Sequence, residues 1–225
     1  DPFISNNPAC QIPVEEFNSD NTMVTHGHSD HLGDAMELSN KNNVPVAAIH
    51  EISLFLSKQG INNIGVNIGG SFIYRGVKFT MLDAKHSSVL DIVEEPLPAG
   101  DAASFLITLE DGTKLFHAGD TGLFGDMKTI IGEIYKPDIA LLPIGDKFTM
   151  GPFEAALATR WIDSKVAIPM HYNTFPPIEQ DPSIYANFVS QLNPNIDVVI
   201  LNPGEYFEYN PENYQTWNQN RNILE

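Results

Sequence analysis

The sequence predicts an α/β (α+β) protein in which mixed sheets are layered against helices. Two hairpin patterns occupy the middle of the chain, at residues 72–82 and 103–117, and after residue 139 short apolar strands alternate with helical patterns. Hairpins indicate antiparallel pairing and strand–helix alternation indicates parallel pairing, so the two patterns together predict sheets of both kinds packed on helices. No internal repeat or linker interrupts residues 1–225, which we therefore take as one domain.

The first half of the chain contains local signals for short strands, helices and one hairpin. Residues 1–8 are expected to leave a strand for a loop rich in Pro and Asn. Helical spacing at intervals of three and four predicts a helix through Leu32, Ala35, Met36 and Leu38. The other elements expected here are a short apolar strand at 23–25, a strand at 44–49, a helix from 52 to 56 that stops before Gly60, and a hairpin of 72–74 with 77–82.

The second half contains stronger boundary signals. The segment 110–113 (EDGT) is a turn signal between strands at 103–109 and 114–117. Residues 89–101 are polar and unpatterned, which predicts a loop that covers a site. Pro152 suits the first position of a helix that runs to residue 162, and Pro137 ends a helix at 123–135. The remaining expected elements are strands at 139–143, 166–169 and 198–201 and a helix at 181–192.

Composition excludes several functional classes. Acidic residues outnumber basic ones 29 to 12, a net charge of −17, and no run of Lys and Arg is present to neutralise phosphates. A nucleic-acid partner is therefore disfavoured. No apolar run reaches the roughly 18 residues of a membrane span. Cys10 is the only cysteine, which rules out an intrachain disulfide and cysteine-rich structural zinc sites and fits a reducing, cytoplasmic location.

Three of the seven histidines fall within residues 26–31, with an aspartate among them. Imidazole and carboxylate groups are preferred ligands of Zn²⁺ and similar ions. In an extended segment the spacing of His26 and His28 puts both rings on one side, where they reach the same ion. Asp30 and His31 follow where the chain turns into a helix and face a different direction, which suits a second ion about 3.5–4 Å from the first.

Residues 25–34 (THGHSDHLGD) resemble the signature of the metallo-β-lactamase superfamily. Later motifs occur in the family's order, so the resemblance extends from residue 1 to about residue 207. Together they resemble a bacterial and archaeal metal-dependent hydrolase branch that is close to the ascorbate-6-phosphate lactonases. These motifs are DAKHS at 83–87, HAGDTG at 117–122, LPIGD at 142–146, FTMG at 148–151, IPMHY at 168–172 and NTFP at 173–176.

The resemblance implies a four-layer αββα sandwich with the metals at one edge, between the ends of two sheets. It implies two ligand sets and one bridging residue: His26, His28 and His86; Asp30, His31 and His171; and Asp120 between them. Asp30, Asp120 and His171 are the residues implied to be catalytic. Two divalent ions are expected, Zn first and Mn, Fe or Ni as alternatives, because availability decides which metal such a site takes.

The expected reaction is hydrolysis of a small lactone, amide or ester by a hydroxide that the two metals share. A phosphodiesterase acting on a small or lipid phosphodiester is the alternative. Redox chemistry at iron is disfavoured because diiron relatives usually carry Glu where this chain has His28. A metal-binding role without catalysis is disfavoured because the implied ligand set is complete.

Several further positions have expected roles. His117 and His50 are interpreted as structural or supporting residues, and Asp1 matches an early aspartate of the family that supports the metal loop from behind. The substrate pocket is expected to depend on loops 89–101 and 146–149 and on a set of candidate lining residues: Asp146, Thr149, Tyr172, Asn173 and Thr174. Family members carry two N-terminal strands before the Asp-Pro-Phe motif, so we expect a first sheet without them or a numbering that starts late. Apolar helix faces suggest a homo-oligomer.

Overall fold

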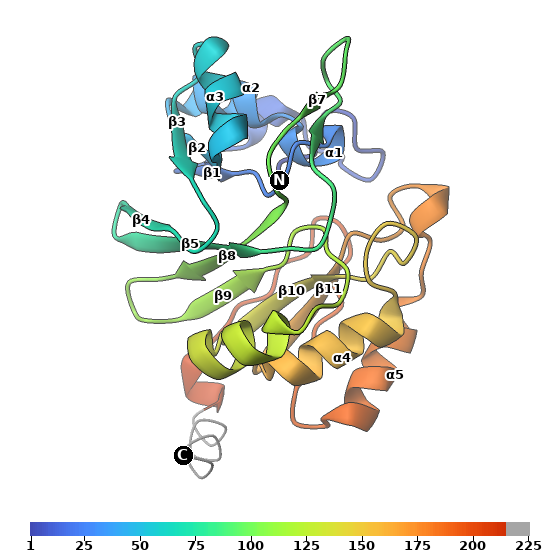
Figure 1. Ribbon diagram of the computed structural model, residues 1–225. Coiled ribbons are helices and arrows are strands. Elements are labelled where there is room, and N and C mark those ends of the chain that lie inside the picture. The colour runs from blue at the N-terminus through green and yellow to red at the C-terminus, as the bar shows by residue number, and fades with distance from the viewer. Residues whose placement is uncertain (215–225) are drawn as a thin grey trace.

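A seven-stranded mixed sheet crosses the middle of the computed structural model, which describes residues 1–214 (Figure 1). Its strand order is β12-β11-β10-β9-β8-β5-β4. Strands β4, β5, β8 and β9 pair antiparallel, whereas β9, β10, β11 and β12 pair in parallel. The bounds are Ser71–Tyr74 (β4), Val77–Asp83 (β5), Ala103–Thr108 (β8), Lys114–His117 (β9), Ile139–Pro143 (β10), Val166–Met170 (β11) and Asp197–Val198 (β12).

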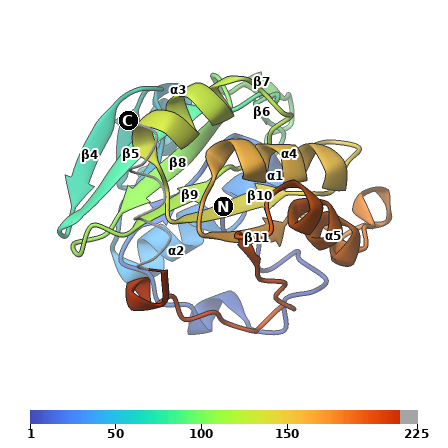
Figure 2. The ribbon, with the colours of Figure 1, turned by 90° about the horizontal axis from the view of Figure 1, so that it is seen from below.

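A smaller sheet of three parallel strands lies above it, in the order β1-β2-β3. Helices α2 and α3 cover the outer face of the small sheet, and η2, α4 and α5 cover the outer face of the large one (Figures 1 and 2). The layers are therefore helix, sheet, sheet and helix, which confirms the predicted αββα sandwich. The bounds are Thr22–Met23 (β1), Val46–Ile49 (β2), Asn63–Val66 (β3), Ala35–Asn42 (α2), His50–Lys58 (α3), Met127–Tyr135 (η2), Pro152–Ile162 (α4) and Pro182–Leu192 (α5).

Short elements complete the described chain. They are η1 (Val14–Glu16), α1 (Ser29–Leu32), the paired strands β6 (Val89–Leu90) and β7 (Leu97–Pro98), η3 (Pro176–Ile178) and η4 (Pro211–Tyr214).

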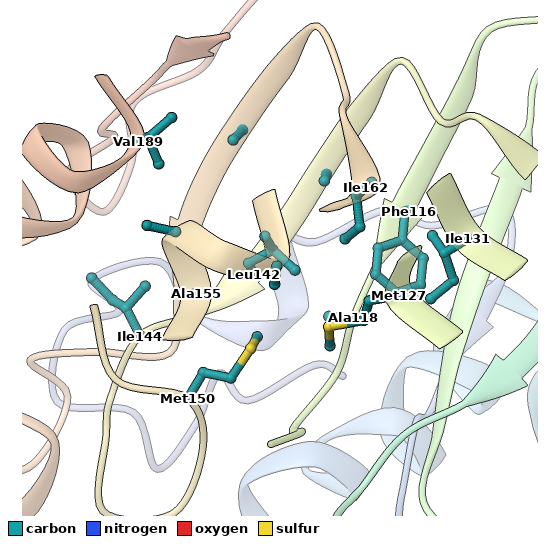
Figure 3. Close-up of a cluster of buried hydrophobic side chains, with 14 of the residues drawn as sticks. Phe116, Ala118, Met127, Ile131, Leu142, Ile144, Met150, Ala155, Ile162 and Val189 are labelled. Atoms are coloured by element: carbon teal, nitrogen blue, oxygen red, sulfur yellow. The ribbon is translucent and has the colours of Figure 1, made fainter. Parts of the chain in front are cut away.

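Two hydrophobic clusters fill the spaces between the layers. The larger one packs η2, α4 and α5 onto the seven-stranded sheet and includes Phe116 and Leu142, both fully buried (Figure 3). The other lies between the two sheets and reaches α3, with Val46, Met81 and Phe105 at 1% exposure or less. Burial of a large apolar side chain stabilises the fold by about 1.5–3 kcal/mol. Both sheets are therefore held firmly on either side of the edge where the site forms.

The structure corrects the start of the chain and the first helix. Residues 1–4 are not part of a strand, because Ile4 and Ser5 donate their backbone N–H groups to Asp34 Oδ2 at 2.8 and 3.0 Å. The single helix predicted around Leu32 is two helices, α1 and α2. They are separated at Gly33, whose φ of 40° an L-residue rarely adopts.

The structure also corrects the ends of several later elements. The strand predicted at 44–49 begins at Val46. The helix predicted from residue 123 begins after Gly125, a poor helix former, and winds as a π-helix in η2. The strand predicted at 198–201 pairs only at Asp197 and Val198. The neighbouring β11 contains Pro169, which has no N–H to extend that ladder.

Two short pairings were not expected. β3 has no apolar alternation, and Gly65 lies within it. Residues 89–101, predicted as a loop, contain the small β6–β7 hairpin. This segment contacts the His-rich loop, since Gly27 donates its N–H to Ser88 Oγ at 3.2 Å and Ser29 donates its hydroxyl to Asp91 Oδ2 at 3.3 Å.

Strand direction explains where the site lies. β5 and β9 are both antiparallel to β8, so they run in the same direction, and β11 is parallel to β10 and hence to β9. The carboxyl ends of β5, β9 and β11 therefore meet at one edge of the large sheet. His86, Asp120 and His171 each follow one of these ends by one to three residues.

Candidate metal centre

The loop after β1 carries the first two candidate ligands. His28 is extended, with φ −63° and ψ 149°, and precedes α1 as its N-cap. His26 and His28 point to the same side, as their spacing predicted, and His26 Nε2 lies 2.9 Å from His28 Nδ1. Asp30 and His31 lie in the first turn of α1, and their ligand atoms gather with that of His171.

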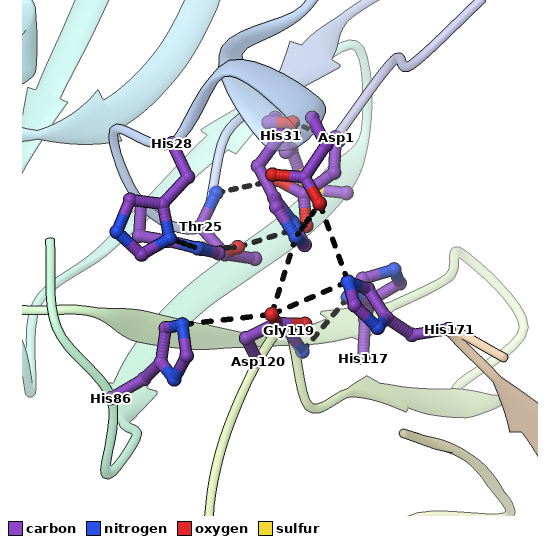
Figure 4. Close-up of polar contacts among 12 residues, drawn as sticks. Asp1, Thr25, His28, His31, His86, His117, Gly119, Asp120 and His171 are labelled. Atoms are coloured by element: carbon purple, nitrogen blue, oxygen red, sulfur yellow. Dashed lines mark hydrogen bonds and ion pairs between the residues drawn. The ribbon is translucent and has the colours of Figure 1, made fainter. Parts of the chain in front are cut away.

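All seven predicted site residues lie together. They form three groups whose ligand atoms are within 4.8 Å of one another, and Figure 4 shows His31, His86 and His171 around Asp120. The groups are His26, His28 and His86; His26, His31 and Asp120; and Asp30, His31 and His171. The first and third groups are the two ligand sets that the family resemblance implied, and the second contains the residue implied to bridge them.

Asp120 occupies the centre of the cluster. Its Oδ2 lies 3.6 Å from His86 Nε2, 3.4 Å from His31 Nε2 and 3.3 Å from His171 Nε2. One carboxylate oxygen is therefore close to ring nitrogens from both predicted sets. Its other oxygen, Oδ1, is buried and accepts no hydrogen bond from residues 1–214. Asp30 lies at the rim of the second set, with Oδ2 3.5 Å from His171 Nε2.

A carboxylate and a hydroxyl hold the His-rich loop from behind. Asp1 Oδ1 accepts the backbone N–H of Thr25 at 2.7 Å, and Asp1 Oδ2 accepts the Thr25 hydroxyl at 2.8 Å. Thr25 Oγ1 lies 3.0 Å from His26 Nδ1, and Asp1 Oδ2 lies 3.0 Å from His31 Nδ1. The His26 ring is thus engaged through Nδ1, which leaves its Nε2 to meet a ligand, whereas the contact of His31 Nδ1 with Asp1 is an ion-pair contact.

The electrostatics keep the donors in the states that bind cations. Burial, aided by the positive charge of His31, lowers the pKa of His26 to about 2. Burial also lowers the pKa of His86. Burial alone would raise the pKa of Asp120, but the hydrogen bond and charge of His31 overcome it and hold the pKa at about 2. At neutral pH His26 and His86 are therefore neutral imidazoles and Asp120 is an ionised carboxylate, the forms that metal binding needs.

Asp30 is ionised for a related reason. Burial would raise its pKa, and the hydrogen bond from His171 together with the charge of His31 lowers it below the usual range.

Comparison with known proteins identifies the family to which the chain belongs. A family model described as a beta-lactamase superfamily domain matches residues 1–172. The chain belongs to the metallo-β-lactamase superfamily. It is 98% identical over 215 residues to a UPF0173 metal-dependent hydrolase of Methanobrevibacter smithii, which covers 96% of this chain and 90% of that relative. A UPF0173 metal-dependent hydrolase of Methanosphaera stadtmanae is 55% identical over 206 residues, or 91% and 88% of the two chains.

A solved structure agrees with these relatives. Igni18, a metallo hydrolase from the hyperthermophilic archaeon Ignicoccus hospitalis, is 38% identical and superposes with a TM-score of 0.80 over 91% of this chain and 88% of its own. This superfamily member is therefore a metal-dependent hydrolase. The closeness to ascorbate-6-phosphate lactonases stays a prediction. None of the helices within residues 1–214 combines the length and apolar character that crossing a bilayer requires.

A pocket of about 220 Å³ opens beside the clustered donors of this superfamily member. It is lined by four of the predicted ligands, Asp30, His31, Asp120 and His171, and by a set of neighbouring side chains: Asp1, Phe3, Asn7, His117, Met170, Thr174 and Phe175. Its volume is below the roughly 300–1,000 Å³ typical of sites for drug-sized ligands, so it suits a small substrate.

Of the predicted pocket residues, Thr174 alone lines this pocket. Tyr172 packs against the core cluster, and Asn173 lines a separate surface hollow with Glu179. Loops 89–101 and 146–149 contribute no lining residue, whereas residues 1–7 and 170–175 contribute several. Phe3 and Phe175 were missed. Their only sequence signal is proximity to Asp1 and His171.

The other two histidines differ in position. His50 is exposed at the start of α3, where its backbone oxygen accepts the Ser53 hydroxyl at 2.7 Å. His117, interpreted from the sequence as a supporting residue, ends β9 and lines the pocket.

Proposed function

We propose that this hydrolase cleaves a small lactone, amide or ester with two divalent metal ions held by the seven clustered side chains. The observation that carries the proposal is the position of Asp120, whose Oδ2 lies 3.3–3.6 Å from ring nitrogens of both predicted ligand sets. A carboxylate in that position can contact two neighbouring cations at once. The first ion would be held by His26, His28 and His86, and the second by Asp30, His31 and His171.

The donor chemistry fits divalent ions. Every ligand atom is an imidazole nitrogen or a carboxylate oxygen, which suits Zn²⁺ first and also Mn²⁺, Fe²⁺ and Ni²⁺. The unpaired Asp120 Oδ1 supports the same conclusion, since a buried carboxylate oxygen without a hydrogen bond is costly unless a cation or a bound water meets it.

Two ions, when bound, supply the acidity that makes water a nucleophile near neutral pH. The chain's own residues then orient that water and the substrate. Four predicted ligands line the pocket and can therefore reach substrate, and we assign the catalytic roles to three of them, Asp30, Asp120 and His171; His31 is the fourth. The lowered pKa of Asp30 keeps its carboxylate ionised and able to accept a hydrogen bond from water.

Replacement of Asp120 tests this proposal. We expect Asp120→Ala to lower kcat on a responsive ester or lactone by about 10²-fold or more, because the group that joins the two sets is lost. The exposed Asp101→Ala is the matched control and should keep full activity. Turnover by Asp120→Ala at the native rate, with circular dichroism unchanged, would refute the bridging role.

A substrate panel separates the two candidate reactions. Lactones, esters, amides and phosphodiesters should be tested on protein loaded with Zn²⁺ and, separately, with Mn²⁺. We expect carbonyl substrates to be cleaved. Preference for a small phosphodiester would replace our proposal with the phosphodiesterase alternative.

We also infer the wider setting of the enzyme. Because both sheets contribute ligands, we propose that the chain acts as one domain, although residues 215–225 lie outside the described part. A single free cysteine supports a cytoplasmic location. The predicted homo-oligomer stays a prediction, with Ile134 and Phe153 exposed on the outer helices as candidate contacts.

A further inference from the structure

His117 presents a fixed hydrogen-bond donor to the pocket. Its Nδ1 accepts the backbone N–H of Gly119 at 3.2 Å. A nitrogen that accepts a hydrogen bond carries no proton, so the ring is neutral and its proton is on Nε2. Burial, which lowers the pKa of His117 to about 3, agrees with a neutral ring. Within residues 1–214 no group is hydrogen-bonded to Nε2, and His117 lies on the His171 side of Asp120 (Figure 4).

The charge of the pocket disfavours anions. None of its lining residues, all within residues 1–175, is Lys or Arg. Three carboxylates, those of Asp1, Asp30 and Asp120, line it and would offset most of the charge that two divalent ions bring. An anionic substrate would therefore gain little net attraction, and an uncharged substrate would enter without losing a strong interaction with water.

One wall of the pocket is apolar. The rings of Phe3 and Phe175 lie 6.1 Å apart at 54°, and Met170 also lines the pocket. Phe175 is held there by a tightly folded segment: Asn173 has φ 61°, its N–H donates to Ile178 O at 3.0 Å, and its Oδ1 accepts the Gln180 N–H at 2.8 Å. This wall is therefore a built part of the pocket.

We propose that the pocket takes an uncharged carboxylic ester, lactone or amide, whose apolar group lies against Phe3 and Phe175 and whose oxygen accepts the Nε2–H of His117. This inference rests on the proposed function. It adds the charge and polarity of the substrate and names His117 as a residue that contacts it. His117 holds its proton throughout and orients the substrate; it transfers nothing.

Two substitutions at His117 separate a donor from a structural role. His117→Gln places an amide N–H near the position of Nε2, whereas His117→Asn keeps an acceptor for the Gly119 N–H and loses that donor. We expect His117→Asn to lower kcat/KM for 4-nitrophenyl butyrate by about 10- to 100-fold, and His117→Gln to stay within about threefold of the native chain. Retained activity in His117→Asn with loss in His117→Gln would overturn the assignment. Metal content should be the same in all three proteins.

Charge is tested with a matched pair of esters. The mono-4-nitrophenyl ester of succinic acid has the same leaving group as 4-nitrophenyl butyrate and differs by a carboxylate at the end of the acyl chain. We expect the native, metal-loaded enzyme to favour the butyrate by about tenfold or more in kcat/KM. Equal or reversed preference would refute the uncharged-substrate inference, while leaving hydrolysis itself established.

A third measurement does not depend on turnover. In the metal-free protein, the ring ¹⁵N shifts of His117 should show a protonated Nε2 and an unprotonated Nδ1. The opposite tautomer would overturn the assignment of His117 Nε2–H as the donor to the substrate. Inertness toward every carbonyl substrate in protein that holds two ions per chain would instead refute the proposed function, so the two failures are distinguishable.

Discussion

At the scale of single residues, the Thr25 hydroxyl links a carboxylate to a candidate metal ligand. It has one proton, which it donates to Asp1 Oδ2 at 2.8 Å, so its contact of 3.0 Å with His26 must be one in which His26 Nδ1–H donates to Oγ1. The lone pair of His26 is therefore on Nε2, the side that faces the other donors. Asp1 Oδ2 also lies 3.0 Å from His31 Nδ1, as an ion-pair contact.

Loss of that hydroxyl should weaken metal binding. We expect Thr25→Val to reduce the affinity of the site for Zn²⁺ by about 10- to 100-fold, because His26 is no longer held in the metal-binding tautomer. Thr25→Ser keeps the hydroxyl and is the control. Competition with a chromogenic chelator measures both, and equal affinity of the Val and native proteins would show that Asp1 alone orients the loop.

Only part of the site could be predicted from local sequence. The four residues His26, His28, Asp30 and His31 lie within six positions of the chain, and their spacing predicted a division between two directions. His86, Asp120 and His171 are separated by 34 and 51 positions, and nothing in a local pattern says that β5, β9 and β11 end at one edge. These three residues were predicted from the family resemblance. The pocket residues Phe3 and Phe175 depend on the fold of two loops, which neither source supplied.

At the scale of elements, the turn after β9 positions Asp120. Gly119 has φ 59°, and a Cβ there would lie 2.8 Å from Thr25 Cβ and 2.9 Å from Ala103 O. This close approach packs the turn that carries Asp120 against the loop that carries His26 and His28, so one contact positions both segments.

Long apolar elements such as α4 could be predicted from the sequence, including its start at Pro152 and its end at Ile162, because they depend on local signals. Short edge pairings such as β3 could not, because they depend on the strands beside them.

A substitution at Gly119 should be more costly than one at an open turn. We expect Gly119→Ala to lower the free energy of unfolding by about 2–4 kcal/mol, from left-handed backbone strain plus steric overlap. Gly112→Ala is the matched control, because Gly112 has φ 88° with nothing within 4 Å of its Cβ position, and we expect a loss of about 1 kcal/mol. Urea denaturation measures both. Equal losses would show that the Thr25 contact is not tight.

At the scale of the whole molecule, the buried imidazoles couple stability to pH. The pKa of His26 is about 2 in the folded chain, lowered mainly by burial, against about 6.5 in an unfolded one. The unfolded chain therefore binds a proton below pH 6.5 that the folded chain does not. This contribution to stability is fully present above pH 6.5 and is lost progressively as the pH falls.

Metal-free protein should accordingly unfold more easily in mild acid. His26 alone should lower the free energy of unfolding by about 2 kcal/mol between pH 7.5 and pH 5. Relief of repulsion among acidic groups acts in the opposite direction in a chain of net charge −17, so the comparison with His26→Gln isolates the effect. The same pH dependence in both proteins, measured as the urea midpoint, would contradict the assignment.

The account depends above all on two metal ions at one edge of the sandwich. The direct measurement is elemental analysis of the native chain after loading with Zn²⁺ and removal of the excess. We predict close to two ions per chain, falling toward one or none in Asp120→Ala. A fully loaded, folded native protein that holds a single ion or none would contradict the binuclear site.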